Sequence, residues 1–257
     1  MNLRRIRLDL EYDGTDFVGW QVQPNERTIQ GELGNALNQF LHQEIVPVGA
    51  GRTDAGVHAQ GQVAHFDTVS TLDCERMMRA LNGILPADIA ATAVRDVAAD
   101  FHARYSAVRK RYRYRISTVK STLQRREVWA LYQNLDAEAM QEASHHLLGT
   151  HGFQAFCNHD PVPESFLCDI THCQWTVSGT DLTLEIEANR FLRHMVRIIV
   201  GTLVEVGRGR MAVASIEDLL TDPDGNPQRG RLADRKNAGP TVPARGLCLR
   251  YVSYPGE

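Results

Sequence analysis

A glycine-rich stretch at residues 49–59 carries the clearest chemical pattern in this sequence. It reads Gly-Ala-Gly-Arg-Thr-Asp-Ala-Gly-Val-His-Ala, so Arg52 and Asp54 stand alone among small residues. Glycines allow a backbone to approach a ligand closely, and a carboxylate framed by small residues can act as a nucleophile at a sugar carbon. A turn in which Asp54 only accepts backbone N–H groups would have the same composition, so the stretch by itself leaves both interpretations open.

A second pattern is a run of basic residues with interleaved tyrosines. Six basic side chains and no acid occur between positions 104 and 115: Arg104, Arg109, Lys110, Arg111, Arg113 and Arg115. A smaller group comprises Arg190, Arg193, His194 and Arg197. Since the net charge is −3, these groups predict either a basic face for nucleic acid on an acidic protein or a solvated face paired with nearby acids.

The first half of the chain must position the glycine-rich stretch. Alternation of apolar residues predicts strands at Arg5–Tyr12, Gln62–Asp67 and Asp88–Val97. Helical spacing predicts a helix capped by Thr28 and another at Cys74–Leu85, while Pro47–Gly61 is predicted as a loop or broken strand.

The second half repeats this plan and must position the basic residues. Strands are predicted at Lys110–Thr118, Ile170–Val177, Leu182–Ala188 and Leu247–Tyr254, with Tyr112, Tyr114 and Ile116 on one side of the first. Helices are predicted at Asp136–Leu148 and about Phe191–Gly207, followed by a short helix from Ser215 with Asp218 completing a capping box. Residues 222–239 are predicted to form a loop.

These elements predict an α+β protein of two similar halves, each a mainly antiparallel sheet with helices packed on it. The boundary is placed near Ser106. This division gives an N-terminal half, 1–105, with the Asp54 loop, and a C-terminal half, 106–257, with Tyr112 and Arg197.

Composition excludes several other classes of protein. The chain has 257 residues, 43% hydrophobic and 23% charged, which is typical of a globular protein. The longest apolar run, 195–206, is too short to span a bilayer, and no signal-peptide pattern follows Met1, so we expect a cytoplasmic protein without a membrane partner.

Five cysteines, an odd number without paired spacing, predict free thiols rather than a disulfide framework. A zinc site is the alternative interpretation of Cys157, His159, Cys168, His172 and Cys173. Their spacing matches no standard finger or ribbon, so we expect no metal.

Short motifs follow one another in order over nearly the whole chain. The central motif is 51–58, Gly-Arg-Thr-Asp-Ala-Gly-Val-His. Others include Tyr12–Thr15 with Gly19–Gln21 and Thr28–Gln30, Gly61–Phe66, Asn82–Pro86, Phe101–Ala107 before Arg111–Tyr114, Asn189–Arg197, and Gly246–Leu249 with Tyr254–Pro255. Together these motifs resemble the TruA family of tRNA pseudouridine synthases.

The resemblance implies a pseudouridine synthase fold with the active-site cleft between the halves. It implies that uridine is isomerised to pseudouridine at positions 38, 39 and 40 of the tRNA anticodon stem–loop. It implies no cofactor, because substrate and product are isomers. It also implies a homodimer in which one RNA crosses both subunits.

The resemblance also implies residue roles. The essential aspartate falls on Asp54, which could attack C1′ or C6 or assist through a glycal-type intermediate, and the target base must first leave the stack. Arg52 matches an arginine that fills the space left by this base. Tyr112 matches an active-site tyrosine that stacks under uracil and could relay the C5 proton.

Arg197 matches an arginine that pairs with the catalytic aspartate and keeps it ionised and aimed. The resemblance further implies that the basic run binds RNA phosphates, with Arg111 and Arg113 as substrate-binding residues. Ordinary structural roles remain the alternatives: a core tyrosine for Tyr112 and a surface ion pair for Arg197.

The sequence departs from the family at two places. Gly152 stands where an acidic residue is common, and the loop 161–169 lacks the usual basic residues and carries Glu164 and Asp169. Two other functions remain open: an RNA-binding protein without catalysis, and a glycoside hydrolase, which would need a second carboxylate that the sequence does not offer near Asp54.

Overall fold

The computed structural model describes residues 3–223 and 233–257. The chain forms two compact units. Unit 1 comprises Met1–Val108 and Cys248–Glu257, and unit 2 comprises Arg109–Leu247.

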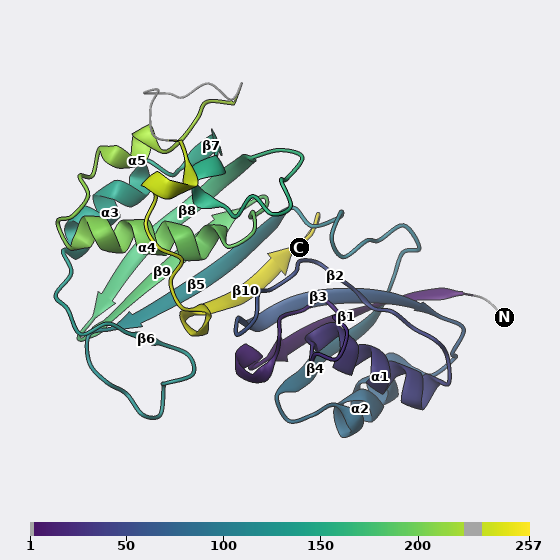
Figure 1. Ribbon diagram of the computed structural model, residues 1–257. Coiled ribbons are helices and arrows are strands. Elements are labelled where there is room, and N and C mark those ends of the chain that lie inside the picture. Colours follow the sequence, from purple (N-terminus) through teal and green to yellow (C-terminus); the bar gives the residue numbers. More distant parts are fainter. Residues whose placement is uncertain (1–2, 224–232) are drawn as a thin grey trace. The chain divides into compact units, whose positions relative to one another are not determined.

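In unit 1 a curved sheet is covered on one face by two helices, α1 (Ile29–Leu41) and α2 (Cys74–Ile84) (Figure 1). The strands follow the order β4-β1-β3-β10. β1 is antiparallel to both neighbours, whereas β3 and β10 run parallel. The strands are β1 (Arg4–Tyr12), β2 (Val48–Gly49), which pairs with β3, β3 (His58–Thr68), β4 (Ile89–Val97) and β10 (Leu247–Ser253).

Local sequence explains these elements. Ile6, Leu8 and Leu10 alternate along β1 and are fully buried, as the period of two predicts. Thr28 caps α1 through a hydrogen bond from the Gly31 N–H to its Oγ1 (3.2 Å), which confirms the predicted cap. β3 begins at His58, earlier than the predicted Gln62, so the loop that carries Asp54 is shorter than expected.

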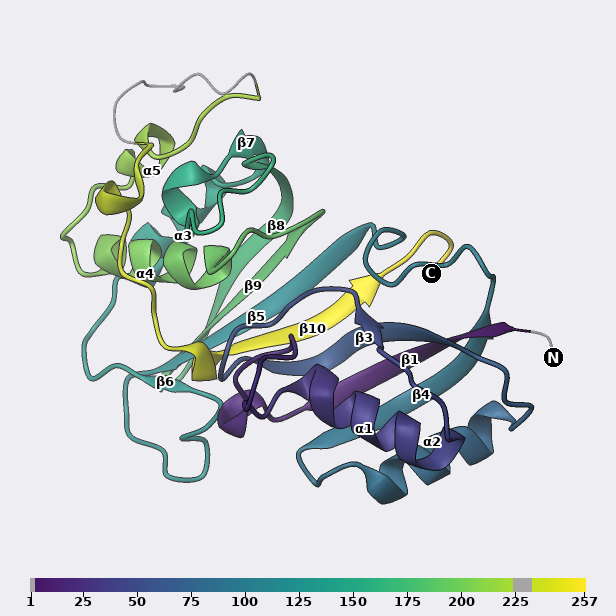
Figure 2. The same ribbon diagram turned by 45° about the vertical axis from the view of Figure 1, so that its right-hand side comes forward.

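Unit 2 has mainly antiparallel strands, covered on one face by α3 (Ala137–His145) and α4 (Met195–Gly207) (Figure 2). Its strands follow the order β5-β9-β8-β7. They are β5 (Arg109–Ser117), β6 (Trp129–Ala130), which runs parallel to β5, β7 (Gly149–Gly152), β8 (Leu167–Ser178) and β9 (Asp181–Ala188). A short α5 (Ser215–Asp218) and four 3₁₀ turns, Gly14–Asp16, Gln154–Phe156, Arg235–Asn237 and Ala244–Gly246, complete the described elements.

Two helix starts differ from the prediction. α4 begins at Met195 rather than near Phe191, because His194 takes a left-handed conformation (φ 62°) that interrupts a helix. The predicted capping box at Ser215 is wrong, since Ala214 occupies the cap position and no side-chain cap bond forms.

The mainly antiparallel strands of each unit, with helices packed on them, confirm the α+β class. The division differs from the predicted 1–105 and 106–257 at the C-terminal end. β10 pairs in parallel with β3, so residues 248–257 belong with unit 1. Of the predicted loop 222–239, residues 224–232 lie outside the described residues.

Other predictions concern the thiols and the membrane. All five cysteines are free, and burial raises the pKa of Cys157 to about 11. Within residues 3–223 and 233–257, no His, Cys, Asp or Glu side chains gather in a group of three that could hold a metal ion. The same part of the chain contains no helix with the length and apolar character needed to cross a membrane.

Candidate active site

Asp54 lies half-buried on the loop between β2 and β3, and Arg52 on the same loop is exposed. The backbone around Asp54 is held on both sides. The Val57 N–H donates to the Asp54 carbonyl (3.2 Å), and the Trp20 N–H donates to the Thr53 carbonyl (3.0 Å). The loop therefore presents its carboxylate from a fixed backbone rather than from a freely moving turn.

Two glycines outside the loop allow this close packing. A Cβ on Gly14 would lie 2.0 Å from the Val57 carbonyl oxygen, and a Cβ on Gly19 would lie 2.7 Å from the Thr53 carbonyl oxygen. Gly19 also has φ of +81°. Only glycine fits at these two positions, which explains why both occur in the N-terminal motifs.

A buried hydrogen-bond network supports the loop from below. Gln62 is fully buried and donates its side-chain amide to the Gly51 carbonyl (3.0 Å) and to the Tyr12 hydroxyl (3.3 Å). The Tyr12 hydroxyl lies 2.9 Å from Thr53 Oγ1, beside Asp54 in the chain. Burial raises the pKa of Tyr12, so its phenol stays protonated and keeps its donor.

The sequence motifs contain Tyr12 and Gln62, but their supporting role was not predicted. Each is a polar residue at a buried strand position, where apolar side chains are usual, and such a residue requires a hydrogen-bond partner. That mismatch is the signal that could have identified them.

In unit 2, Tyr112 lies on the buried face of β5 and is 8% exposed. Its ring meets Phe191 edge-on, with ring centroids 5.2 Å apart. Tyr114, on the same face, is fully buried and donates its hydroxyl to the Pro243 carbonyl (2.7 Å). Tyr114 is therefore the core aromatic of this strand, as the sequence suggested.

Arg197 lies in the first turn of α4 and is half-buried. Its Nε donates to the Val242 carbonyl (2.8 Å), which fixes the plane of the guanidinium. The positive charges of Arg197 and Arg245 act on Tyr114 and partly oppose the burial that raises its pKa. Arg197 thus lies close enough to Tyr114 on β5 for its charge to act on the phenol.

Arg111 and Arg113 lie on the opposite face of β5 from Tyr112, because alternate residues of a strand point to opposite faces. Arg111 pairs with Glu187 (3.1 Å) and Glu185 (3.5 Å) on β9. Ion pairs to acids of unit 2 also form at Arg109, with Asp169 (2.7 Å), and at Arg115, with Asp181 (3.5 Å) and Glu127 (3.6 Å). The paired interpretation of the basic run is therefore confirmed for Arg109, Arg111 and Arg115.

The acidic stretch 161–169 is only partly a loop, since β8 begins at Leu167. Asp169 lies in this strand, and Arg109 balances its charge. The presence of Asp169 in the sequence therefore does not indicate an acidic loop that faces RNA.

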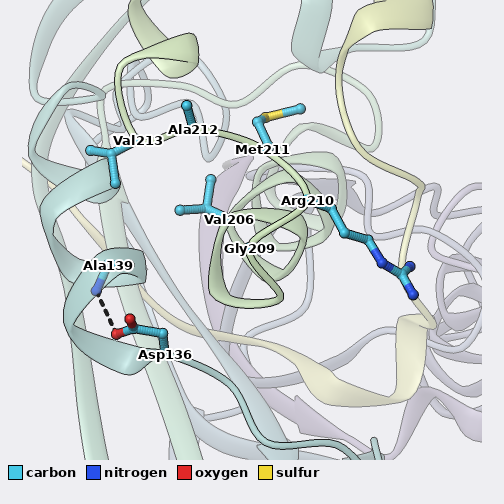
Figure 3. A pocket seen from close by; sticks show the side chains of 8 residues that line it. All are labelled: Asp136, Ala139, Val206, Gly209, Arg210, Met211, Ala212 and Val213. Carbon is cyan, nitrogen blue, oxygen red and sulfur yellow. Dashed lines mark hydrogen bonds between the residues drawn. The ribbon is translucent and has the colours of Figure 1, made fainter.

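A pocket of about 430 Å³ opens at one end of α3 in unit 2 (Figure 3). Asp136, Val206 and Met211 are among its lining residues. Figure 3 shows that the Asp136 carboxylate is engaged as the helix cap, accepting from the Ala139 N–H (3.0 Å). None of the predicted site residues lines this pocket.

Comparison with known proteins gives a consistent result. The family model described as tRNA pseudouridine synthase matches residues 10–106 and 143–255, which include Arg52, Asp54 and Arg197 but not Tyr112. A protein of Moorella thermoacetica named tRNA pseudouridine synthase A is 45% identical over 97% of this chain and 99% of its own.

Relatives with the same name occur in distant bacteria. The protein of Myxococcus xanthus is 42% identical over 97% of this chain and 92% of its own. That of Bacteroides thetaiotaomicron is 40% identical over 99% of this chain and 92% of its own. On these matches, the chain belongs to the tRNA pseudouridine synthase family.

Proposed function

We propose that this protein isomerises uridine to pseudouridine in the anticodon stem–loop of tRNA, at positions 38, 39 and 40, with Asp54 as the nucleophile. Family membership supports the reaction. The observation that carries the role of Asp54 is its placement on a loop whose backbone is bonded on both sides of the carboxylate, at Thr53 and Val57.

The chemistry fits a protein that contributes only side chains. The N1–C1′ bond of uridine breaks, the base turns, and a C5–C1′ bond forms while C5 loses its proton and N1 gains one. No atoms or electrons are added, so the reaction requires no ATP and no redox partner. Attack of Asp54 at C1′, attack at C6, and assistance through a glycal-type intermediate all need the same placed carboxylate.

The target uridine must leave its stack before a side chain reaches C1′ or C6. Arg52 is exposed and lies two residues before Asp54 on the same loop. We propose that its planar guanidinium occupies the space of the extruded base, a role that its stacking and phosphate-pairing ability supports.

Tyr112 and Arg197 are proposed to complete the catalytic set. Tyr112 would stack under the uracil and take or relay the C5 proton, and its contact with Phe191 supports a fixed ring orientation. Arg197 is proposed as the cationic partner of the catalytic carboxylate, and the bond from its Nε to Val242 supports a preset guanidinium.

RNA contacts by Arg111 and Arg113 are still predictions. A phosphate would compete with Glu185 and Glu187 for the Arg111 guanidinium. Homodimer formation is a further proposal that follows from the family resemblance. A cytoplasmic location is also proposed, on the sequence composition. Sedimentation of the protein with and without tRNA measures the dimer directly.

Tritium release from unmodified tRNA labelled at C5 of uridine tests the function, with EDTA present and no cofactor added. We expect release from the anticodon arm with the native protein. Asp54→Asn should lower the rate by on the order of 10³-fold or more while tRNA binding persists. Glu75→Gln, which removes one exposed carboxylate on α2, serves as the matched control and should retain full activity.

Two outcomes would contradict the proposal. Tight tRNA binding without tritium release would favour an RNA-binding protein that lacks catalysis. Release of free uracil would instead favour a glycoside hydrolase.

A further inference from the structure

Three aromatic rings of unit 1 contact one another in series, each tilted against the next, and the outermost one faces solvent. His65 on β3 lies 4.7 Å from His102, and His102 lies 4.4 Å from Tyr105, measured between ring centroids. Exposure rises along this series from 5% for His65 to 76% for Tyr105. A tyrosine this exposed and yet supported by a second ring presents a flat apolar surface to solvent.

The backbone that carries these rings is firmly held. The Ala103 N–H donates to His65 Nδ1 (3.1 Å), and its carbonyl accepts the Tyr254 hydroxyl (2.7 Å). Two hydrogen bonds between Ser106 and His102 close the turn. The Ser106 N–H donates to the His102 carbonyl (2.8 Å), and the His102 N–H donates to the Ser106 Oγ (2.9 Å). The position of Tyr105 is therefore set before any ligand arrives.

The His102 ring is fixed as well. Its Nδ1 lies 3.2 Å from both the Arg104 N–H and the Tyr105 N–H and accepts from them. Burial, together with the charges of Arg5 and Arg104, lowers the pKa of His102, so the imidazole is neutral at physiological pH. A neutral ring that accepts two backbone bonds is a structural support for Tyr105 rather than a proton donor.

Charge at this site differs from charge on the rest of the basic run. Arg109, Arg111 and Arg115 pair with acids of unit 2. Among the residues that the structure describes, no acid pairs with Arg104, whose guanidinium is exposed and lies 5.6 Å from the Tyr105 ring. An unbalanced cation beside an exposed aromatic ring is a combination suited to a nucleotide, with its planar base and anionic phosphate.

We propose that Tyr105, supported by His102, forms a stacking site for an unpaired nucleobase of the bound RNA, and that Arg104 contacts the adjacent phosphate. None of these residues belongs to the Asp54 loop. The identity of the RNA as tRNA rests on the proposed function, whereas the site itself rests on the ring stack and the charge of Arg104.

A protein partner fits the site less well. Interfaces between protein chains bury a broad patch of apolar surface, whereas among the residues next to Tyr105 in the chain, 104–108, Val108 (44% exposed) is the only other large exposed apolar side chain. Arg104 and the polar edge of His102 surround the ring instead, which favours a single planar group as the occupant.

Equilibrium binding of unmodified tRNA tests the proposal, in an Asp54→Asn background that keeps the substrate intact. Tyr105→Ala should raise the Kd by about 10-fold, because stacking of one base contributes on that scale, whereas Tyr105→Phe should bind as the parent does. Arg104→Ala should raise the Kd and reduce the slope of log Kd against log salt by about one.

Matched controls separate these effects from a general loss of aromatic or positive surface. Tyr132→Ala removes another exposed tyrosine (64% exposed), and Arg79→Ala removes an exposed arginine of α2. Both should bind tRNA with the parent Kd. Crosslinking of 4-thiouridine-substituted tRNA should label a peptide that contains Tyr105, and the label should disappear in Tyr105→Ala.

The possible outcomes decide between occupants. An unchanged Kd in Tyr105→Ala would overturn the proposal, and a shift in sedimentation with an unchanged Kd would show an interface between copies of the chain instead. Loss of binding in Tyr105→Phe would also overturn it, since the ring would remain. Binding is measured whether or not pseudouridine forms, so failure of the proposed catalysis leaves this result readable.

Discussion

The buried amide of Gln62 donates a hydrogen bond to the Gly51 carbonyl at 3.0 Å, and this bond ties the catalytic candidate loop to strand β3. The same amide reaches the Tyr12 hydroxyl, which in turn contacts Thr53. Gln62 lies outside the loop but positions both neighbours of Arg52, Gly51 directly and Thr53 through Tyr12. Its effect on the reaction must act through the placement of Asp54.

Gln62→Leu should lower kcat for tritium release by about 10- to 100-fold with a small change in KM, because a misplaced nucleophile loses orientation while RNA contacts persist. Gln43→Leu is the matched control. It removes the acceptor of Thr68 Oγ1 in the same unit, away from the loop, and should lower stability without lowering kcat. Equal losses of kcat in the two variants would show that general destabilisation, not placement, explains the effect.

Gly19→Ala should disturb the Asp54 loop, because the new Cβ would lie 2.7 Å from the Thr53 carbonyl oxygen and φ is +81°. We expect a loss of roughly 1–3 kcal/mol in the free energy of unfolding, with a fall in activity. Gly83→Ala in α2 places its Cβ in open space and should be neutral or stabilise by up to about 1 kcal/mol. Urea unfolding of both variants checks this, and equal stability of the two would contradict it.

Stability should depend on pH through His65. Burial is the main cause that lowers the pKa of His65 to about 4 in the folded protein, whereas the unfolded imidazole titrates near 6.5. Between these pH values the unfolded chain binds more protons than the folded protein. The contribution of the neutral His65 to the free energy of unfolding is therefore fully present above pH 6.5 and is lost as the pH falls toward 4. It amounts to about 3 kcal/mol at most.

Urea unfolding of the native protein and of His65→Gln, at several pH values between 4.5 and 7.5, measures this contribution. The variant cannot take up a proton at this position. Its free energy of unfolding should therefore fall less steeply with decreasing pH, and an identical pH dependence would rule out His65 as the source.

Tyr112 and Tyr114 should separate catalysis from packing. Tyr114→Phe removes the hydrogen bond to the Pro243 carbonyl and should cost about 1 kcal/mol of stability with little change in kcat. Tyr112→Phe should lower kcat far more than Tyr114→Phe does, if the phenol relays the C5 proton. Thermal unfolding and tritium release on both variants provide the comparison, and a reversed pattern would exchange the two roles.

Local sequence alone determined most of the helices and strands and the α+β class. The alternation of Ile6, Leu8 and Leu10, the cap at Thr28 and the two-sided pattern of β5 are all properties of neighbouring residues, and short-range sterics and hydrogen bonds decide them. The Asp54 motif was also identifiable, since its small neighbours lie beside it in the chain. Roles for Tyr112 and Arg197 came from resemblance and stay predictions.

Tertiary structure decided the features that depend on distant residues. The acids that pair with Arg111 lie on β9 and become its neighbours only through strand register, in which Arg111 faces Glu187. Residues 248–257 join unit 1 because β10 finds a partner in β3. Likewise, His65 and Tyr105 are distant in sequence and share one stack through His102. Long-range pairing is selected by the burial and hydrogen bonding of the whole fold, and no local pattern contains that information.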